Sequence, residues 1–250
     1  MTSWPYPLWL AHRGAGRLAP ENTLAAFRVG AGFGHRAFEC DVKLSRDGEA
    51  FLLHDDTLDR TSSGSGSPAG QDWAALARLD AGGWHSPPYT AEPLPRLAQV
   101  AAFCRANGCA LNLEIKPCPG EEARTGAAVA REAARLWAGA GTPPLLSSFK
   151  PEALAAARDA APALPRALLL DTLWDGWPGA AARLGVAAVI TNWRLMDRAL
   201  IERLHGQGWR ALVYTVNDAD VAGRLIADGI DGLITDAVDR LGPGRQPMRA

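Results

Sequence analysis

The chain of 250 residues has no run of basic residues: 26 Lys and Arg are balanced by 27 Asp and Glu, for a net charge of −1. A surface that binds nucleic acid needs a basic patch or stripe, so this balance excludes a dedicated nucleic-acid-binding protein. No apolar run is long enough to span a bilayer, which excludes stable membrane insertion. Residues 1–10 have neither a basic start nor a long apolar stretch, so we expect no signal peptide.

Cysteine is also scarce in this chain. The four cysteines show neither CxxC spacing nor a secreted disulfide pattern; they are Cys40, Cys104, Cys109 and Cys118. We therefore expect reduced thiols in a cytoplasmic protein. Hydrophobic residues make up 48% of the chain and charged residues 21%. This composition supports a large core and excludes wholesale disorder.

Apolar runs alternate with helix-like segments along the chain. Eight runs each lead into such a segment, and they are centred on Leu10, Cys40, Leu113, Leu146, Leu168, Val189, Val213 and Ile234. Eight βα repeats with mostly apolar strands predict an α/β protein, a (β/α)8 TIM barrel formed by residues 1–250 as a single domain. Residues 50–53 make a ninth run, and the Asp47-Gly48 turn before it predicts a hairpin with the second strand.

A capped helix and a loop-like insertion are also predicted within the first hundred residues. Asn22 or Thr23 is expected to cap a helix that Gly32 and Gly34 end. Residues 57–95 are loop-like, with a short helix expected near residues 73–79. Their apolar content is too small for a separate core, so we expect a small insertion over one face of the barrel, after the hairpin.

Polar residues gather where the predicted strands end, which is where barrel enzymes place their catalytic groups. The residues at these ends are His12, Arg13, Glu39, Asp41, His54, Glu114 and Lys116. Glu39 and Asp41 lie two apart on one strand and so share a face, as do Glu114 and Lys116. By contrast, the predicted strand starts are mostly Ala, Leu and Gly.

Taken one at a time, these residues have structural explanations. A lone histidine near a strand end is more often a satisfied structural residue, and Glu114 with Lys116 alone is typical of a salt bridge. Glu39 with Asp41 alone is as consistent with a network paired to Arg or Lys as with a metal site. The convergence of all these groups on one mouth favours a functional site.

The charged members of the set predict the ligands. Glu39, Asp41 and Glu114 offer oxygen ligands, which suit one divalent cation, Mg²⁺ or Ca²⁺, better than zinc. Arg13 and Lys116 would be redundant beside such a site unless an anion such as phosphate also binds there.

The two histidines predict the chemistry. His12 and His54 come from different strands and titrate near neutrality, so they form a natural general acid and general base pair. Together with the carboxylates and cations, they predict metal-assisted cleavage of a phosphate ester, with the metal and the cations stabilising the charged transition state.

The order of these motifs along nearly the whole chain resembles that of the glycerophosphodiester phosphodiesterase family. The matching motifs are His12-Arg13-Gly14, Pro20-Glu21-Asn22-Thr23, Glu39-x-Asp41, His54-Asp55, Glu114-x-Lys116, Ser148-Phe149 and Thr215-Val216-Asn217. Residues 52–56, 143–149 and 212–217 are especially similar to the bacterial cytoplasmic form. No piece of the set is specific alone, but the combined set is highly specific.

The resemblance implies a TIM-barrel hydrolase of lipid and glycerol metabolism. Such an enzyme converts glycerophosphodiesters, the deacylated phospholipids, to sn-glycerol 3-phosphate and an alcohol. The implied roles are acid and base for His12 and His54, metal binding for Glu39, Asp41 and Glu114, and substrate binding for Arg13, Lys116 and Tyr214. The family often has Trp where Tyr214 stands, so stacking and hydrogen bonding both stay open at that position.

Several alternatives stay open at this stage. The partner is a small-molecule substrate, but the alcohol, the native metal, the assignment of acid and base, a cyclic phosphate intermediate and the choice between monomer and homodimer are undecided. Related barrels that resemble phosphatidylinositol phospholipase C or sphingomyelinase D act on intact lipids. They would need an apolar membrane-facing patch and often carry a secretion signal. A catalytically idle phosphodiester-binding module should have lost a histidine or a carboxylate, and all are present.

Overall fold

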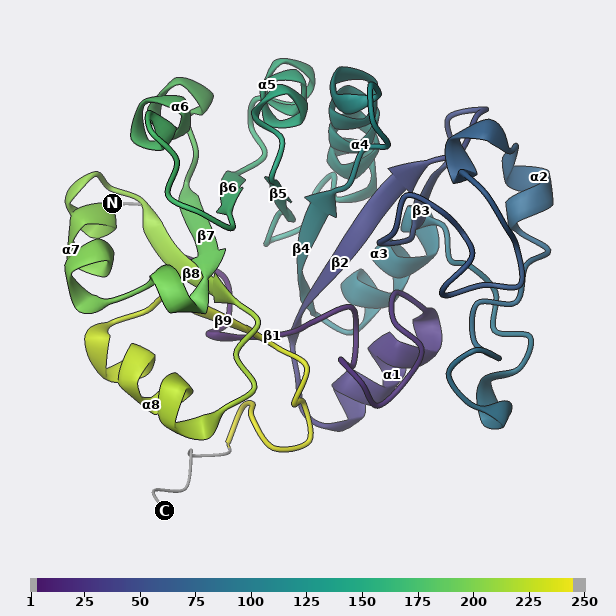
Figure 1. Ribbon diagram of the computed structural model, residues 1–250, viewed down its shortest axis with the longest axis horizontal. Helices are drawn as coiled ribbons and strands as arrows, with labels where there is room; N and C mark the ends of the chain where they lie inside the picture. The colour runs from purple at the N-terminus through teal and green to yellow at the C-terminus, as the bar shows by residue number, and fades with distance from the viewer. Residues whose placement is uncertain (1–3, 245–250) are drawn as a thin grey trace.

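A closed barrel of eight parallel strands forms the centre of the protein (Figure 1), which confirms the predicted (β/α)8 fold. The computed structural model describes residues 4–244. The barrel strands are β1 (Trp9–Ala11), β2 (Ala37–Leu44), β4 (Ala110–Ile115), β5 (Leu145–Ser148), β6 (Arg166–Leu170), β7 (Ala188–Asn192), β8 (Arg210–Tyr214) and β9 (Gly232–Thr235). Pairing of β1 with both β9 and β2 closes the ring. The carboxyl ends of all eight strands therefore meet at one mouth.

Helices connect the strands and surround the barrel in Figure 1. They are α1 (Leu24–Gly32), α3 (Leu97–Ala106), α4 (Glu122–Leu136), α5 (Pro151–Ala160), α6 (Trp177–Leu184), α7 (Arg198–Gly206) and α8 (Ala219–Asp228). No helix among residues 4–244 is both long enough and apolar enough to cross a membrane.

The predicted hairpin is confirmed. Strand β3 (Ala50–Leu52) pairs antiparallel with β2, with Val42 opposite Leu52. Gly48 in the connecting turn has φ = 88°, a left-handed conformation that glycine adopts without steric cost. The hairpin returns the chain from the long β2 strand to the mouth of the barrel.

Residues 53–96 connect β3 to α3 and lie beside the barrel, at the right of Figure 1. They contain α2 (Trp73–Leu76), which is shorter than the predicted helix, and 3-10 turns at Pro68–Gly70 and Pro87–Tyr89. A small apolar cluster that includes Phe51, Leu58 and Leu76 packs this segment against β3. The segment is therefore anchored to the hairpin.

Two glycines of α1 have opposite surroundings and give a stability prediction. A Cβ atom on Gly30 would lie 2.1 Å from the Gly14 carbonyl oxygen, whereas a Cβ atom on Gly32 would meet nothing within 4 Å. We expect Gly30→Ala to destabilise the protein by about 1–3 kcal/mol, because α1 must move away from the loop after β1. Gly32→Ala should be neutral or stabilising, by up to about 1 kcal/mol. Urea unfolding of both variants tests this pair, and equal stabilities would contradict the close approach.

Candidate active site

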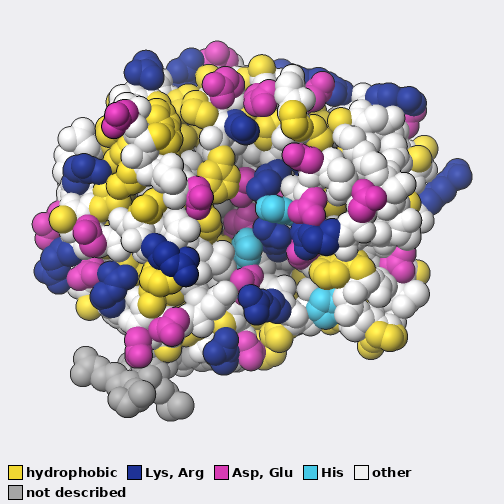
Figure 2. Space-filling view, in the orientation of Figure 1, with side chains coloured by type: hydrophobic (Ala, Val, Ile, Leu, Met, Phe, Trp, Pro, Cys, Tyr) yellow, Lys and Arg dark blue, Asp and Glu magenta, His cyan; other side chains and the backbone are white. Residues whose placement is uncertain are grey.

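A cavity of about 380 Å³ opens at the mouth of the barrel. Figure 2 shows histidine, basic and acidic side chains gathered around a hollow near the centre of this face. All but one of the sequence-predicted site residues line the cavity: His12, Arg13, Glu39, His54, Glu114, Lys116 and Tyr214. Asp41, the remaining one, is buried next to it and contacts both cations. The structure thus brings the whole predicted set together.

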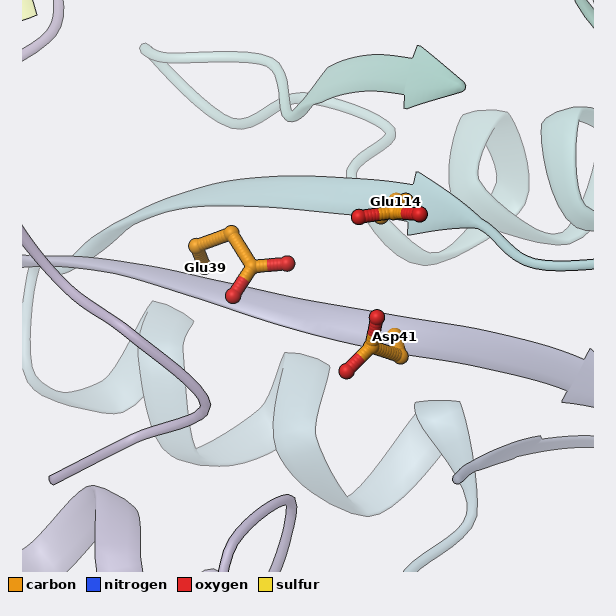
Figure 3. Close-up of side chains that lie close together, drawn as sticks. All are labelled: Glu39, Asp41 and Glu114. Carbon is orange, nitrogen blue, oxygen red and sulfur yellow. The ribbon is translucent and has the colours of Figure 1, made fainter. Parts of the chain in front are cut away.

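Three carboxylates lie close together on two neighbouring strands (Figure 3). Glu39 and Asp41 project from β2, and Glu114 projects from β4, where it pairs in register with Asp41. One oxygen of each lies within 4.8 Å of the others, and all three side chains are buried. Among residues 4–244 no other group of three His, Cys, Asp or Glu residues meets this criterion.

Without a divalent cation, the two buried glutamates stay partly protonated at neutral pH. Burial, and then the charge of Asp41, raise the pKa of Glu39 to about 8 and that of Glu114 to about 7. Burial also disfavours the Asp41 carboxylate, but Arg13, His54, Lys116 and a hydrogen bond from Asn22 outweigh it and lower the pKa of Asp41. The cluster therefore fits a hard divalent cation, whose charge would allow all three groups to ionise.

The raised pKa values predict how stability depends on pH in the absence of divalent cations. The ordinary pKa of these groups is 4.5, so between about pH 5 and pH 8 the folded protein holds protons that the unfolded chain releases. This contribution is complete below pH 4.5 and is lost as pH rises through about 7 and then 8. We expect the melting temperature in EDTA to fall by several degrees between about pH 6 and pH 9.

Thermal melts of wild type and of the Glu39→Gln, Glu114→Gln double variant would check this dependence. Neither glutamine titrates, so the variant should lose much less stability over the same pH range. An equal fall in both proteins would show that other groups cause it.

His12 directly follows β1 and is held by a carboxylate far away in sequence. Its Nδ1 lies 2.6 Å from Oδ1 of Asp236, and Nε2 lies 3.8 Å from Oε2 of Glu39. Asn217 in turn donates to Asp236 at 3.0 Å. Burial opposes the charged imidazole, but the bond to Asp236 and the charge of Glu39 outweigh it and raise the pKa of His12. With Nδ1 bound to Asp236, Nε2 is the nitrogen available to a ligand.

His54 follows β3 and has a similar arrangement. Its Nδ1 lies 2.6 Å from Oδ1 of the neighbouring Asp55. Burial, together with the charges of Arg13 and Lys116, lowers the pKa of His54 despite the opposing charge of Asp41. The two histidines thus face one cavity with their pKa values shifted in opposite directions, a pattern typical of an acid and base pair.

Two cations complete the wall beside the carboxylates. The Arg13 Nη1 donates to Glu21 at 2.8 Å, and its Nε lies 3.3 Å from Oδ2 of Asp41. The Lys116 Nζ donates to Glu114 at 2.9 Å. Both side chains are about four-fifths buried, and both line the cavity, so an anion that enters meets positive charge on this wall.

Two aromatic side chains, Tyr214 and Phe149, also line the cavity. Tyr214, at the end of β8, meets Phe149 edge to face with ring centroids 5.6 Å apart. The Tyr214 hydroxyl donates to Asp171 at 3.1 Å. Burial raises the pKa of Tyr214, so the phenol stays protonated at neutral pH. Both a ring edge and a hydroxyl group are therefore present at this position.

Sequence reasoning did not assign the groups that hold the site residues in place. Asn22 was expected to compete with Thr23 as helix cap; Thr23 is the cap, and Asn22 instead donates to Asp41 at 2.8 Å from a left-handed conformation, φ = 59°. The sequence does place Asp236 at the end of the last predicted strand, where polar residues indicate the mouth of the barrel. Its contact with His12 spans 224 positions, which no local pattern reveals.

Comparisons with known proteins agree with this geometry. A sequence model of the glycerophosphoryl diester phosphodiesterase family matches residues 12–240. The protein YhdW of Bacillus subtilis, described as a candidate glycerophosphodiester phosphodiesterase, is 30% identical; the match covers 92% of this chain and 94% of that one. A glycerophosphodiester phosphodiesterase of Caldanaerobacter subterraneus is 29% identical, over 94% of this chain and 96% of its own.

Solved structures include a similar barrel. A phosphodiesterase from Oleispira antarctica, in complex with the product sn-glycerol 3-phosphate, superposes with a TM-score of 0.87. The two sequences are 32% identical, and the match covers 94% of each chain.

Proposed function

Since the chain belongs to the glycerophosphoryl diester phosphodiesterase family and is an enzyme, we propose that it hydrolyses glycerophosphodiesters to sn-glycerol 3-phosphate and an alcohol. One observation carries the proposal: two histidines, each fixed through Nδ1 by a carboxylate, face one cavity with a basic wall and a carboxylate cluster. The product bound by the Oleispira antarctica relative supports the same substrate class.

The catalytic groups in this proposal are His12 and His54. One imidazole takes a proton from the nucleophile, and the other gives a proton to the oxygen of the leaving alcohol. Asp236 and Asp55 accept from the two Nδ1 atoms, so they fix the tautomer that presents Nε2 to the substrate. Water or the glycerol 2-hydroxyl group can serve as the nucleophile, and the latter gives a cyclic phosphate first.

The phosphate is proposed to bind beside the cations. Arg13 and Lys116 lie next to the carboxylate cluster and would hold the two non-bridging oxygens of the diester, which share one negative charge. Glu39, Asp41 and Glu114 would hold Mg²⁺ or Ca²⁺, which when bound stabilises the negative charge that develops on phosphate oxygens. Tyr214 lines the same cavity and would contact an organic part of the substrate.

The remaining proposals concern the cellular compartment, the domain organisation and the oligomeric state of the protein. All four cysteines are free and buried in the structure, which supports a reducing compartment and hence the cytoplasm. One apolar cluster joins residues of β1 and β2 to Val238, which follows the last strand, and this supports a single domain with residues 57–95 as its insertion. A monomer or a homodimer is compatible with this site.

A coupled assay for sn-glycerol 3-phosphate tests the function directly. Glycerophosphocholine, glycerophosphoethanolamine and glycerophosphoglycerol would each be incubated with the protein in EDTA, Mg²⁺ and Ca²⁺. We expect release of sn-glycerol 3-phosphate in at least one metal. Turnover of intact phospholipid alone would favour the lipid-cleaving barrels, and binding without turnover would favour an idle module.

A further inference from the structure

Arg60 lies in the segment that connects β3 to α3 and does not line the cavity, yet every nitrogen of its guanidinium is bound to one of two carboxylates. Nη1 and Nη2 donate to the two oxygens of Glu21 at 2.9 and 2.8 Å. Nε and Nη2 donate to the two oxygens of Asp55 at 2.6 and 2.9 Å. Arg60 thus holds two carboxylates in the bidentate geometry that gives the strongest and most directional pairs.

Each of these carboxylates holds one residue of the proposed active site. Glu21 accepts from Nη1 of Arg13 at 2.8 Å, and Asp55 lies 2.6 Å from Nδ1 of His54. The contacts form an unbroken chain from the proposed phosphate-binding cation to one of the proposed acid and base groups. Arg60 is its central member.

The contacts with Arg60 also explain why the Glu21 and Asp55 side chains are ionised. Hydrogen bonds from Arg60 are the main reason why the pKa of Asp55 lies well below its usual range. Burial alone would raise the pKa of Glu21, but the hydrogen bond from Arg60 and the charge of Arg13 outweigh burial and lower that pKa. Without Arg60, two neighbouring carboxylates would repel each other, and each would hold its partner through a single side-chain contact.

We infer that Arg60 is a positioning residue for the proposed reaction: by joining Glu21 to Asp55 it fixes the Arg13 guanidinium relative to the His54 imidazole. This inference rests on the proposed function. It assigns a role in catalytic geometry to the segment between β3 and α3. Displacements of about 1 Å in such groups cost about 100-fold in rate.

The Arg60→Gln variant tests the inference. We expect kcat to fall by about 10- to 100-fold, with the melting temperature above the assay temperature. The control is Arg78→Gln, which removes an exposed arginine from the same segment and should leave kcat unchanged. Arg60→Lys should recover part of the loss, because an ammonium group keeps the charge but cannot bind both carboxylates in a bidentate manner.

A double-mutant cycle with Asp55→Asn separates positioning from general damage. If Arg60 acts through Asp55, the double variant should be little slower than the slower single variant. Full multiplication of the two losses, or a kcat for Arg60→Gln within twofold of wild type, would overturn the inference.

An NMR readout keeps the inference separate from the proposed function. The ¹⁵N signals of the His54 ring should show the Nδ1-protonated tautomer in wild type and a mixture in Arg60→Gln. This measurement needs no turnover. A wild-type protein that releases no sn-glycerol 3-phosphate would refute the function alone, whereas unchanged His54 signals in Arg60→Gln would refute the positioning role.

Discussion

Replacement of His12 or His54 by Ala is expected to lower kcat for a glycerophosphodiester by about two to four orders of magnitude, the contribution of a positioned acid or base. Each imidazole faces the cavity and is bound through Nδ1 to a carboxylate. Alanine removes the proton carrier but leaves the barrel strands unchanged. The coupled sn-glycerol 3-phosphate assay would measure the loss.

The matched control for these variants is His205→Ala. His205 is an exposed histidine near the end of α7, where it pairs with Asp231 at 2.6 Å, and it lies outside the cavity at the mouth. We expect its replacement to leave kcat within about twofold, as for surface groups away from the chemistry. Near wild-type activity in both His12→Ala and His54→Ala would refute the two-histidine mechanism.

A change of leaving group would distinguish the roles of the two histidines. An alcohol as acidic as 4-nitrophenol leaves without protonation, so the loss of the general acid matters little for its ester. The variant that recovers more activity on this ester than on glycerophosphocholine lacks the acid. The other variant, which lacks the base, should be impaired on both substrates.

The barrel could be predicted from the sequence because its signals are local. Each buried strand is a short apolar run, and each is followed by helical spacing, so the run centred on Leu113 was predicted and is observed as β4, Ala110–Ile115. The common location of the polar groups could also be predicted, because each group follows a local strand signal and the strand ends of a parallel barrel share one mouth. Glu39 and Glu114 were expected at one mouth, and both line the cavity there.

The contacts that hold the site in place could not be predicted for the same reason. Asp236 reaches His12 only after the barrel closes, and Arg60 reaches Glu21 across 39 positions. No periodicity links such pairs. Their residue types are ordinary in loops, where Asp and Arg are more often solvated than functional. Tertiary events create these contacts: closure of the barrel through β1 and β9 for the first, and packing of the segment between β3 and α3 for the second.

Removal of divalent cations is expected to lower kcat by about three orders of magnitude. The reason is that the cation contributes several kcal/mol to stabilisation of the transition state. In the protein without a cation, burial and the Asp41 charge keep Glu39 and Glu114 partly protonated near neutral pH. Cation binding must therefore release protons, and the apparent affinity should rise as pH increases from about 6 to 8.

Calorimetric titration of the EDTA-treated protein with Mg²⁺ or Ca²⁺ would measure both the affinity and the proton release. The proton release is obtained by repeating the titration in buffers of different ionisation enthalpy.

Glu114→Gln keeps the size of the side chain but removes one charge from the cluster. We therefore expect it to weaken cation binding by at least about tenfold, the loss typical of groups that merely orient a metal ligand. Glu202→Gln removes an exposed carboxylate from α7 and should bind like wild type. Full activity in EDTA, or equal affinity in both variants, would exclude the cluster as the cation site. In that case the raised pKa values would mean that Glu39 and Glu114 act as neutral hydrogen-bond donors to the phosphate, and activity would fall as pH rises above about 8.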